Sequence, residues 1–143
     1  MGLDAFQSAA AFYDVLFDAE ARTKREAPFL RAVLEKAPGG RVVDIACGTG
    51  FHARLLAELG ATVDAFDLSE AMIERARRVR PHECVRYAAG DMRHVAGGPW
   101  DLAVCLGSSL SLLPGHGAVA DTFASVHDAL VPVSYTHLRA HET

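Results

Sequence analysis

The hydrophobic and polar residues of this chain follow two alternating periods. Four short apolar runs predict strands, and these cover Val42–Ile45, Ala61–Phe66, Glu83–Ala88 and Trp100–Leu106. Around and between them, apolar residues recur at helical spacing, which predicts helices at Met1–Glu20, Ala21–Ala37, Phe51–Leu59, Glu70–Val79 and about Val119–Leu130. Strands that alternate with helices indicate an α/β domain with a parallel, doubly wound sheet.

A glycine turn follows the first predicted strand directly. The stretch RVVDIACGTGFHA runs from Arg41 to Ala53 and carries Gly48 and Gly50. Glycines let the chain turn tightly and let its backbone approach a ligand closely. The next helix begins at once, so its unpaired N–H groups face the turn as a polar cradle. The spacing Gly48-x-Gly50-x-x-Ala53 also fits a dinucleotide-binding fingerprint, so the turn alone does not identify the ligand.

An aspartate stands at the end of the second predicted strand. The carboxyl ends of parallel strands form the ligand-binding edge of such a sheet. Asp67 comes 17 residues after Gly50, close to the length that one helix and one strand require. Its carboxylate can accept hydrogen bonds from both hydroxyls of a ribose. The alternative role of helix N-cap suits Ser69 better, because Ser69 directly precedes the predicted helix.

Three segments of the chain resemble motifs of one family. D-I-A-C-G-T-G, with Asp44 four residues before Gly48, resembles the first motif of class I S-adenosylmethionine (SAM)-dependent methyltransferases. A-G-D-M, which ends at Met92, resembles the third motif of that family. CLGSSLSLLP, which begins at Cys105, resembles the C-L-G-N-S-x-x-H-L-P segment of glycine and sarcosine N-methyltransferases. The resemblance covers nearly all of residues 1–132.

The resemblance implies a Rossmann-like fold with SAM as the cofactor. Residues 1–132 would form the N-terminal, incomplete part of a SAM-binding methyltransferase domain. About four strands in the order 3-2-1-4 are expected, preceded by N-terminal cap helices, whereas a complete member has further strands.

The same resemblance implies which residues contact SAM. Asp67 would accept from the ribose and Asp91 from the adenine amino group. Arg22 would pair its planar guanidinium with the SAM carboxylate, and Asp44 would orient the glycine turn or the SAM amino group. The full expected set is Tyr13, Arg22, Asp44, Ala46, Gly48, Gly50, Asp67, Leu68, Met72, Asp91, Met92 and Leu106. No general base is indicated, and no metal site is expected.

Four of these assignments have a purely structural alternative. Tyr13 is a lid over the cofactor or an ordinary packing aromatic of the first helix. Arg22 belongs to an R-T pair that resembles one in glycine N-methyltransferases, or it is a solvated helix charge. Met72 also fits a core position of its helix, and Asp91 also fits a surface turn.

Two departures from the family pattern concern the substrate. Ser108 stands where the glycine and sarcosine enzymes have Asn, and Leu112 stands where they have His. Ser is shorter than Asn, and His can titrate whereas Leu cannot. The SAM half of the resemblance survives these changes, but a glycine-like substrate does not follow from it.

The composition is that of an ordinary globular domain. The chain has 143 residues, of which 50% are hydrophobic and 22% charged, with a formal net charge of −4. The negative charge argues against a nucleic-acid-coating surface. No apolar segment is long enough to span a bilayer, and there is no signal-peptide pattern at the start. Three cysteines without a C-x-x-C motif favour buried thiols in a reducing cytoplasm. The oligomeric state is not indicated.

The C-terminal segment Val133–Thr143 changes character. VSYTHLRAHET has no core pattern and resembles the in-frame translation of a sequencing adapter. We therefore expect a non-native tail, which is excluded from the reasoning about the fold, with native sequence ending near Pro132. The fourth strand would then be an open apolar edge, and the chain would be a marginal, aggregation-prone fragment.

The sequence favours methyl transfer from SAM to a small-molecule acceptor, with an amine as the candidate. The protein would mainly supply alignment and exclusion of water, which fits the absence of a nucleophile–base pair from the sequence pattern. Two alternatives stay open. One is an NAD-dependent oxidoreductase, in which G-D-M and C-L-G-S-S have no role. The other is a non-catalytic SAM-binding domain.

Overall fold

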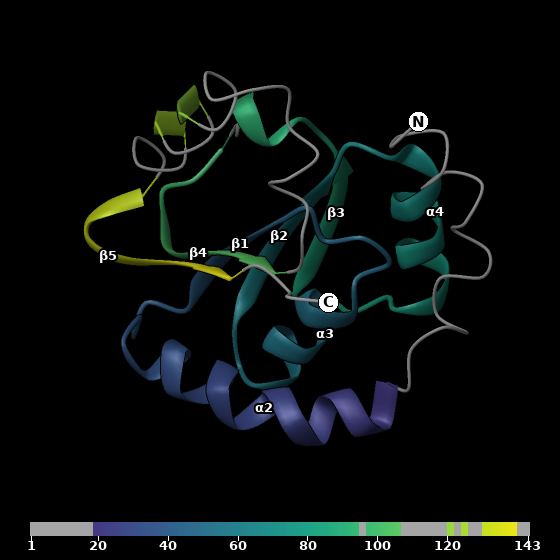
Figure 1. Cartoon of the computed structure of the whole chain (residues 1–143), viewed down its shortest axis with the longest axis horizontal. Helices are drawn as coiled ribbons and strands as arrows, with labels where there is room; N and C mark the ends of the chain where they lie inside the picture. Colours follow the sequence, from purple (N-terminus) through teal and green to yellow (C-terminus); the bar gives the residue numbers. More distant parts are fainter. Residues whose placement is uncertain (1–18, 95–96, 107–119, 122–123, 126–129, 140–143) are drawn as a thin grey trace.

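The computed structural model describes residues 19–94, 97–106, 120–121, 124–125 and 130–139. Parallel strands form one sheet, with α-helices beside it (Figure 1). The elements are α2 (Ala19–Glu35), β1 (Arg41–Ile45), α3 (Phe51–Glu58), β2 (Thr62–Asp67), α4 (Glu70–Val79), β3 (Val85–Ala89), η2 (Met92–His94), β4 (Trp100–Leu106) and β5 (Leu130–Arg139). The strand order is β3-β2-β1-β4-β5, and all neighbours are parallel.

The predicted alternation of strands and helices is confirmed for the described residues. β4 and α4 have the predicted bounds, and the other predicted elements from α2 to β3 differ by at most two residues at either end. The predicted order 3-2-1-4 is that of β3, β2, β1 and β4. Ala19 and Glu20, assigned to the first predicted helix, belong to α2, and the rest of that helix lies outside the described residues. Residues 120–121 and 124–125 of the last predicted helix are helical.

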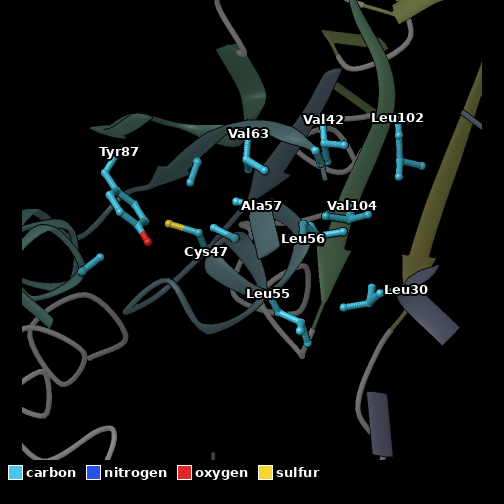
Figure 2. Close-up of a cluster of buried hydrophobic side chains, with 14 of the residues drawn as sticks. Leu30, Val42, Cys47, Leu55, Leu56, Ala57, Val63, Tyr87, Leu102 and Val104 are labelled. Atoms are coloured by element: carbon cyan, nitrogen blue, oxygen red, sulfur yellow. The ribbon is translucent and has the colours of Figure 1, made fainter. Parts of the chain in front are cut away.

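One face of the sheet packs against the helices. Successive residues of a strand point to opposite faces, and Val42 of β1 shares a core with Val63 of β2 and Val104 of β4. Leu30 of α2 and Leu56 of α3 cover this face and are no more than 1% exposed (Figure 2). α4 adds its apolar side to the same cluster.

The opposite face buries a second cluster. Val43 and Ile45 of β1 lie with Ala103 and Cys105 of β4, and Trp100 packs against them. None of these side chains is more than 3% exposed. β1 and β4 are therefore buried on both faces, as the continuous apolar runs of a doubly wound sheet require.

A fifth strand corrects two expectations. β5 spans Leu130–Arg139 and pairs in parallel with β4 up to Leu106↔Arg139, and Figure 1 shows it in yellow along β4. β4 thus lacks the open edge that we expected, and much of Val133–Thr143 takes part in the sheet. Leu130, expected to end the last helix, begins this strand instead.

The composition of β5 explains why it pairs. Its sequence LVPVSYTHLR is rich in β-branched and aromatic residues, which suit a pleated strand. The register shifts between Trp100 and Leu102, whose partners are Leu130 and Tyr135. Pro132 falls between those partners and has no N–H to give to the ladder. The non-native origin of the segment stays a prediction.

We expect Leu56→Ala to lower the free energy of unfolding by about 2–5 kcal/mol, because a fully buried leucine leaves a cavity when it is truncated. Leu56 is 0% exposed. Urea denaturation measures the change. The matched control is Glu58→Ala in the same helix, which removes only a surface pair with Arg54 and is expected to cost about 0.5 kcal/mol or less. Equal effects of the two variants would contradict the packing of α3.

Candidate functional site

The glycine turn between β1 and α3 has an unusual backbone. Ala46, Gly48 and Gly50 have φ angles of 60°, 58° and 88°. Among the described residues Ala46 is the non-glycine residue with positive φ, a conformation that costs roughly 1–2 kcal/mol for an L-residue. Cys47 N–H donates to Phe66 O at 2.9 Å and fixes the turn to the end of β2. Strain kept at such a turn is typical of a ligand-binding site.

Arg80, the C-cap residue of α4, and Tyr87 of β3 support the glycine turn. The Tyr87 hydroxyl donates to Arg80 O at 2.8 Å, and Arg80 Nη1 donates to Thr49 Oγ1 at 2.9 Å and to Thr49 O at 3.0 Å. A Cβ on Gly50 would meet the Tyr87 hydroxyl at 2.4 Å. Figure 2 shows Tyr87 and Cys47 together at one end of the buried cluster. Gly50 is thus required by its φ and by the lack of space.

Asp67 connects the turn to the start of α4. Its Oδ2 accepts from Gly48 N–H at 2.8 Å, and its Oδ1 accepts from Ser69 N–H at 2.8 Å. Burial raises the pKa of Asp67, and these two hydrogen bonds oppose the rise. An ionised carboxylate has about four acceptor positions, so capacity for a ribose remains. Ser69 is the N-cap of α4, as predicted, and its Oγ accepts from Met72 N–H at 3.3 Å.

Asp44 lies beneath the turn in the middle of the sheet. It is 2% exposed, and among the described residues its Oδ2 is the buried side-chain oxygen or nitrogen that has no hydrogen-bond partner. Burial, with a smaller contribution from the charge of Asp67, raises the pKa of Asp44 to about 8. A buried polar atom without a partner is costly, and a positively charged ligand group would satisfy it.

Arg22 lies beside the first turn of α3. Its Nε donates to Glu26 Oε2 at 3.0 Å, and its guanidinium carbon lies 5.0 Å from the centre of the Phe51 ring. Glu26 Oε1 is 3.1 Å from His52 Nε2. Burial opposes the ionisation of Glu26, but the hydrogen bond and charge of His52, together with Arg22, outweigh it and lower the pKa of Glu26 to about 2. Arg22 is therefore held in place next to the glycine turn.

Asp91 is engaged differently from our expectation. Both of its carboxylate oxygens accept from Arg93, whose Nε lies 3.0 Å from each. This hydrogen bond is the main cause that lowers the pKa of Asp91. An adenine amino group would have to share the carboxylate with Arg93, so the adenine role stays a prediction.

The remaining residues of the expected cofactor set differ in their burial. Leu68 follows Asp67 and is 56% exposed, the exposed large apolar side chain of the described residues. Met72 is 1% exposed, which favours its alternative as a core residue. Leu106 ends β4 and is half-buried. Met92 begins η2, and Tyr13 lies outside the described residues.

Sequence reasoning missed the supports of the turn. For Glu26 a local signal existed, since it stands four residues after Arg22 on a helix. Glu26 also contacts His52, and Tyr87 lies against Arg80 and Gly50. These contacts join separate elements, and no local sequence pattern predicts them.

The described residues show neither of two other kinds of site. No three His, Cys, Asp or Glu side chains among them gather closely enough to hold a metal ion. Within the same residues no helix is both long enough and apolar enough to cross a membrane.

Comparison with known proteins decides the family. A family model described as a methyltransferase domain matches residues 42–133. The chain belongs to this methyltransferase family. The resemblance to class I SAM-dependent methyltransferases is thereby confirmed, and so is the Rossmann-like fold of the domain.

Similar methyltransferases are longer than this chain. It is 35% identical over 130 residues to the putative methyltransferase YqeM of Bacillus subtilis, covering 89% of this chain and 51% of that protein. It is 34% identical over 126 residues to a glycine/sarcosine N-methyltransferase of Halorhodospira halochloris, covering 84% and 47%. SAM-bound CalS10, an amino pentose methyltransferase from Micromonospora echinaspora, matches with a TM-score of 0.69 at 28% identity, over 87% of this chain and 52% of that chain. The chain spans about half the length of the curated relatives it matches.

We expect Gly50→Ala to destabilise this methyltransferase domain more than Gly60→Ala does. Both glycines have positive φ, 88° and 107°, but only at Gly50 would the new Cβ meet another atom. Gly60→Ala should cost roughly 1–2 kcal/mol for the backbone alone, and Gly50→Ala should cost more because Tyr87 must move. Urea denaturation of both variants measures the difference, and equal losses would contradict the close contact.

The stability of the domain should fall as pH rises from about 4 to about 8, through Asp44. The unfolded carboxyl loses its proton near pH 4, whereas the folded one keeps it up to about pH 8. The folded state therefore binds more protons in this window, and ionisation favours unfolding. Asp44→Asn has no such proton, so its stability relative to the wild type should improve by several kcal/mol between pH 5 and pH 8. A difference that does not change with pH in urea denaturation would refute the buried neutral carboxyl.

Proposed function

We propose that this chain carries the SAM-binding part of a methyltransferase that acts on a small-molecule amine. The observation that carries the proposal is the unpartnered oxygen of Asp44 beneath a strained glycine turn. Asp67 lies at the same edge of the sheet, where ligands bind in this class of fold. The family match supports a methyltransferase. A glycine/sarcosine N-methyltransferase and an amino pentose methyltransferase among the similar proteins support an amine acceptor.

The residues present fit the parts of SAM. Asp44 would face the amino group, which is the cation that its buried carboxyl lacks. Arg22 would pair with the carboxylate, and the uncapped N-terminus of α3 favours the same negative charge. Asp67 would hold the ribose with its remaining acceptor positions, and the exposed apolar Leu68 would lie against the adenine. When bound, SAM supplies an electrophilic methyl group on its sulfonium.

The chain's own contribution to catalysis would be alignment. The strained turn, held by Asp67, Tyr87 and Arg80, would hold the cofactor in one position relative to the acceptor. Positioning of this kind accounts for a large share of rate acceleration when two reactants must meet in line. An amine acceptor has to lose its proton before attack, and no residue is assigned to take it.

A nicotinamide-dependent oxidoreductase is the second candidate. The glycine turn and Asp67 would also suit a dinucleotide, but the family match is to methyltransferases.

We further propose a cytoplasmic location, since the cysteines Cys47, Cys84 and Cys105 are free. The adapter origin of residues 133–143 also stays a proposal, and an independent DNA read across the codon for Pro132 tests it.

Calorimetry should show binding of S-adenosylhomocysteine and none of NAD. Asp67→Ala should weaken the binding of S-adenosylhomocysteine by about 1.5–3 kcal/mol, the scale of lost charge-assisted hydrogen bonds. This variant also frees Gly48 N–H and Ser69 N–H, so a control must share that defect.

Asp101→Ala is the matched control. Asp101 also accepts a hydrogen bond from a backbone N–H, that of Arg41 at 3.0 Å, but it stands at the start of β4, at the opposite edge of the sheet from Asp67. Its removal should leave the affinity unchanged within about twofold, well below the effect of one charge-assisted hydrogen bond. Equal weakening by both variants would reject the ribose assignment, and NAD binding in place of S-adenosylhomocysteine would reject the proposed function.

A further inference from the structure

We propose that Glu26 is a positioning residue for the cofactor carboxylate. It would act by clamping Arg22 and His52 on either side of one buried carboxylate. The inference rests on the proposed function, in which Arg22 meets the carboxylate of SAM, and it adds a residue that does not itself touch the cofactor.

The geometry of the clamp involves two helices. Glu26 and Arg22 are on α2, and His52 is the second residue of α3. One carboxylate oxygen of Glu26 accepts a hydrogen bond from Arg22 Nε at 3.0 Å, and the other oxygen lies 3.1 Å from His52 Nε2. The side chains of Arg22, His52 and Glu26 are only 12%, 11% and 10% exposed. Glu26 thus ties α2 to the beginning of α3, directly after the glycine turn.

Burial makes the ion pair between Arg22 and Glu26 different from an ordinary ion pair on a helix surface. A surface pair is weak because water screens it and because long side chains stay mobile. Glu20 and Lys24 form such a pair on the same helix, 3.3 Å apart and 83% and 78% exposed. The Glu26 pair is shielded from water, so its loss would leave Arg22 without the charge that fixes its orientation.

Arg22 has a second fixed neighbour, which defines where its charge lies. Its guanidinium carbon is 5.0 Å from the centre of the Phe51 ring, and Phe51 is the first residue of α3. The clamp and the ring together hold a long, flexible cation beside the N-terminus of α3. An arginine that is already oriented loses less conformational freedom when it binds a carboxylate. Glu26 would therefore raise the affinity for ligands that carry the amino-acid carboxylate, and for those ligands only.

The test compares two ligands on the full chain. S-adenosylhomocysteine carries the amino-acid part, whereas 5′-methylthioadenosine shares the adenosine and sulfur but lacks that part. Glu26→Gln should weaken S-adenosylhomocysteine roughly 10-fold, the size of one charge-assisted hydrogen bond. It should change the affinity for 5′-methylthioadenosine by about twofold or less. Glu20→Gln, the matched control in the exposed pair, should change neither affinity.

Each other outcome has a distinct meaning. If Glu26→Gln weakens both ligands equally, Glu26 is merely structural and the inference is overturned. If Arg22→Gln weakens S-adenosylhomocysteine selectively but Glu26→Gln does not, the clamp is wrong while the proposed function stands. If the wild type binds neither ligand, the proposed function fails, and the inference fails with it. Should Glu26→Gln not fold, His52→Ala removes the other half of the clamp and should weaken S-adenosylhomocysteine selectively, by roughly threefold, below the effect of a full charge-assisted hydrogen bond.

Discussion

The carboxylate of Asp67 holds together the carboxyl edge of this sheet. One oxygen accepts from Gly48 in the turn after β1, and the other accepts from Ser69 at the start of α4. The end of β2 thereby sets the positions of the two loops that border it. Because the turn contains strained residues, it would not keep its shape without such partners. We propose that the same carboxylate also binds the ribose, so that one side chain would serve both architecture and binding.

Acidic and basic side chains both lie close to the glycine turn. Asp44 and Asp67 lie on the sheet side of the turn, and their proximity helps to keep a proton on Asp44. Arg22 and Arg80 lie near the first residue of α3, with their guanidinium carbons 5.0 Å and 5.9 Å from the centre of the Phe51 ring. The amino-acid end of SAM presents an ammonium and a carboxylate on one carbon. We propose that Asp44 faces the ammonium of this pair and that Arg22 faces the carboxylate.

Among the described residues we assign none to the methyl acceptor. The described residues supply the glycine turn between β1 and α3, the carboxylate of Asp67 on β2, and the contacts of Glu26 on α2 with Arg22 and with His52 on α3. The chain spans about half the length of the curated relatives it matches, and the identity of the acceptor stays a proposal.

The sequence by itself determined the elements from α2 to β4, apart from the short η2, together with their order and the position of the glycine turn. Periodicity and glycine spacing act over a few residues, and the ligand edge of a parallel sheet then follows from topology, which is why Asp67 could be placed beside Gly48. Only the tertiary structure decided that Glu26 meets His52 and that Tyr87 closes the space behind Gly50. The tertiary structure also decided that Arg93 donates hydrogen bonds to Asp91 and that β5 pairs with the edge of β4. The first two contacts and the covering of β4 join residues far apart in sequence. The pairing of Arg93 with Asp91 is local, but it depends on side-chain conformations that residue spacing does not fix.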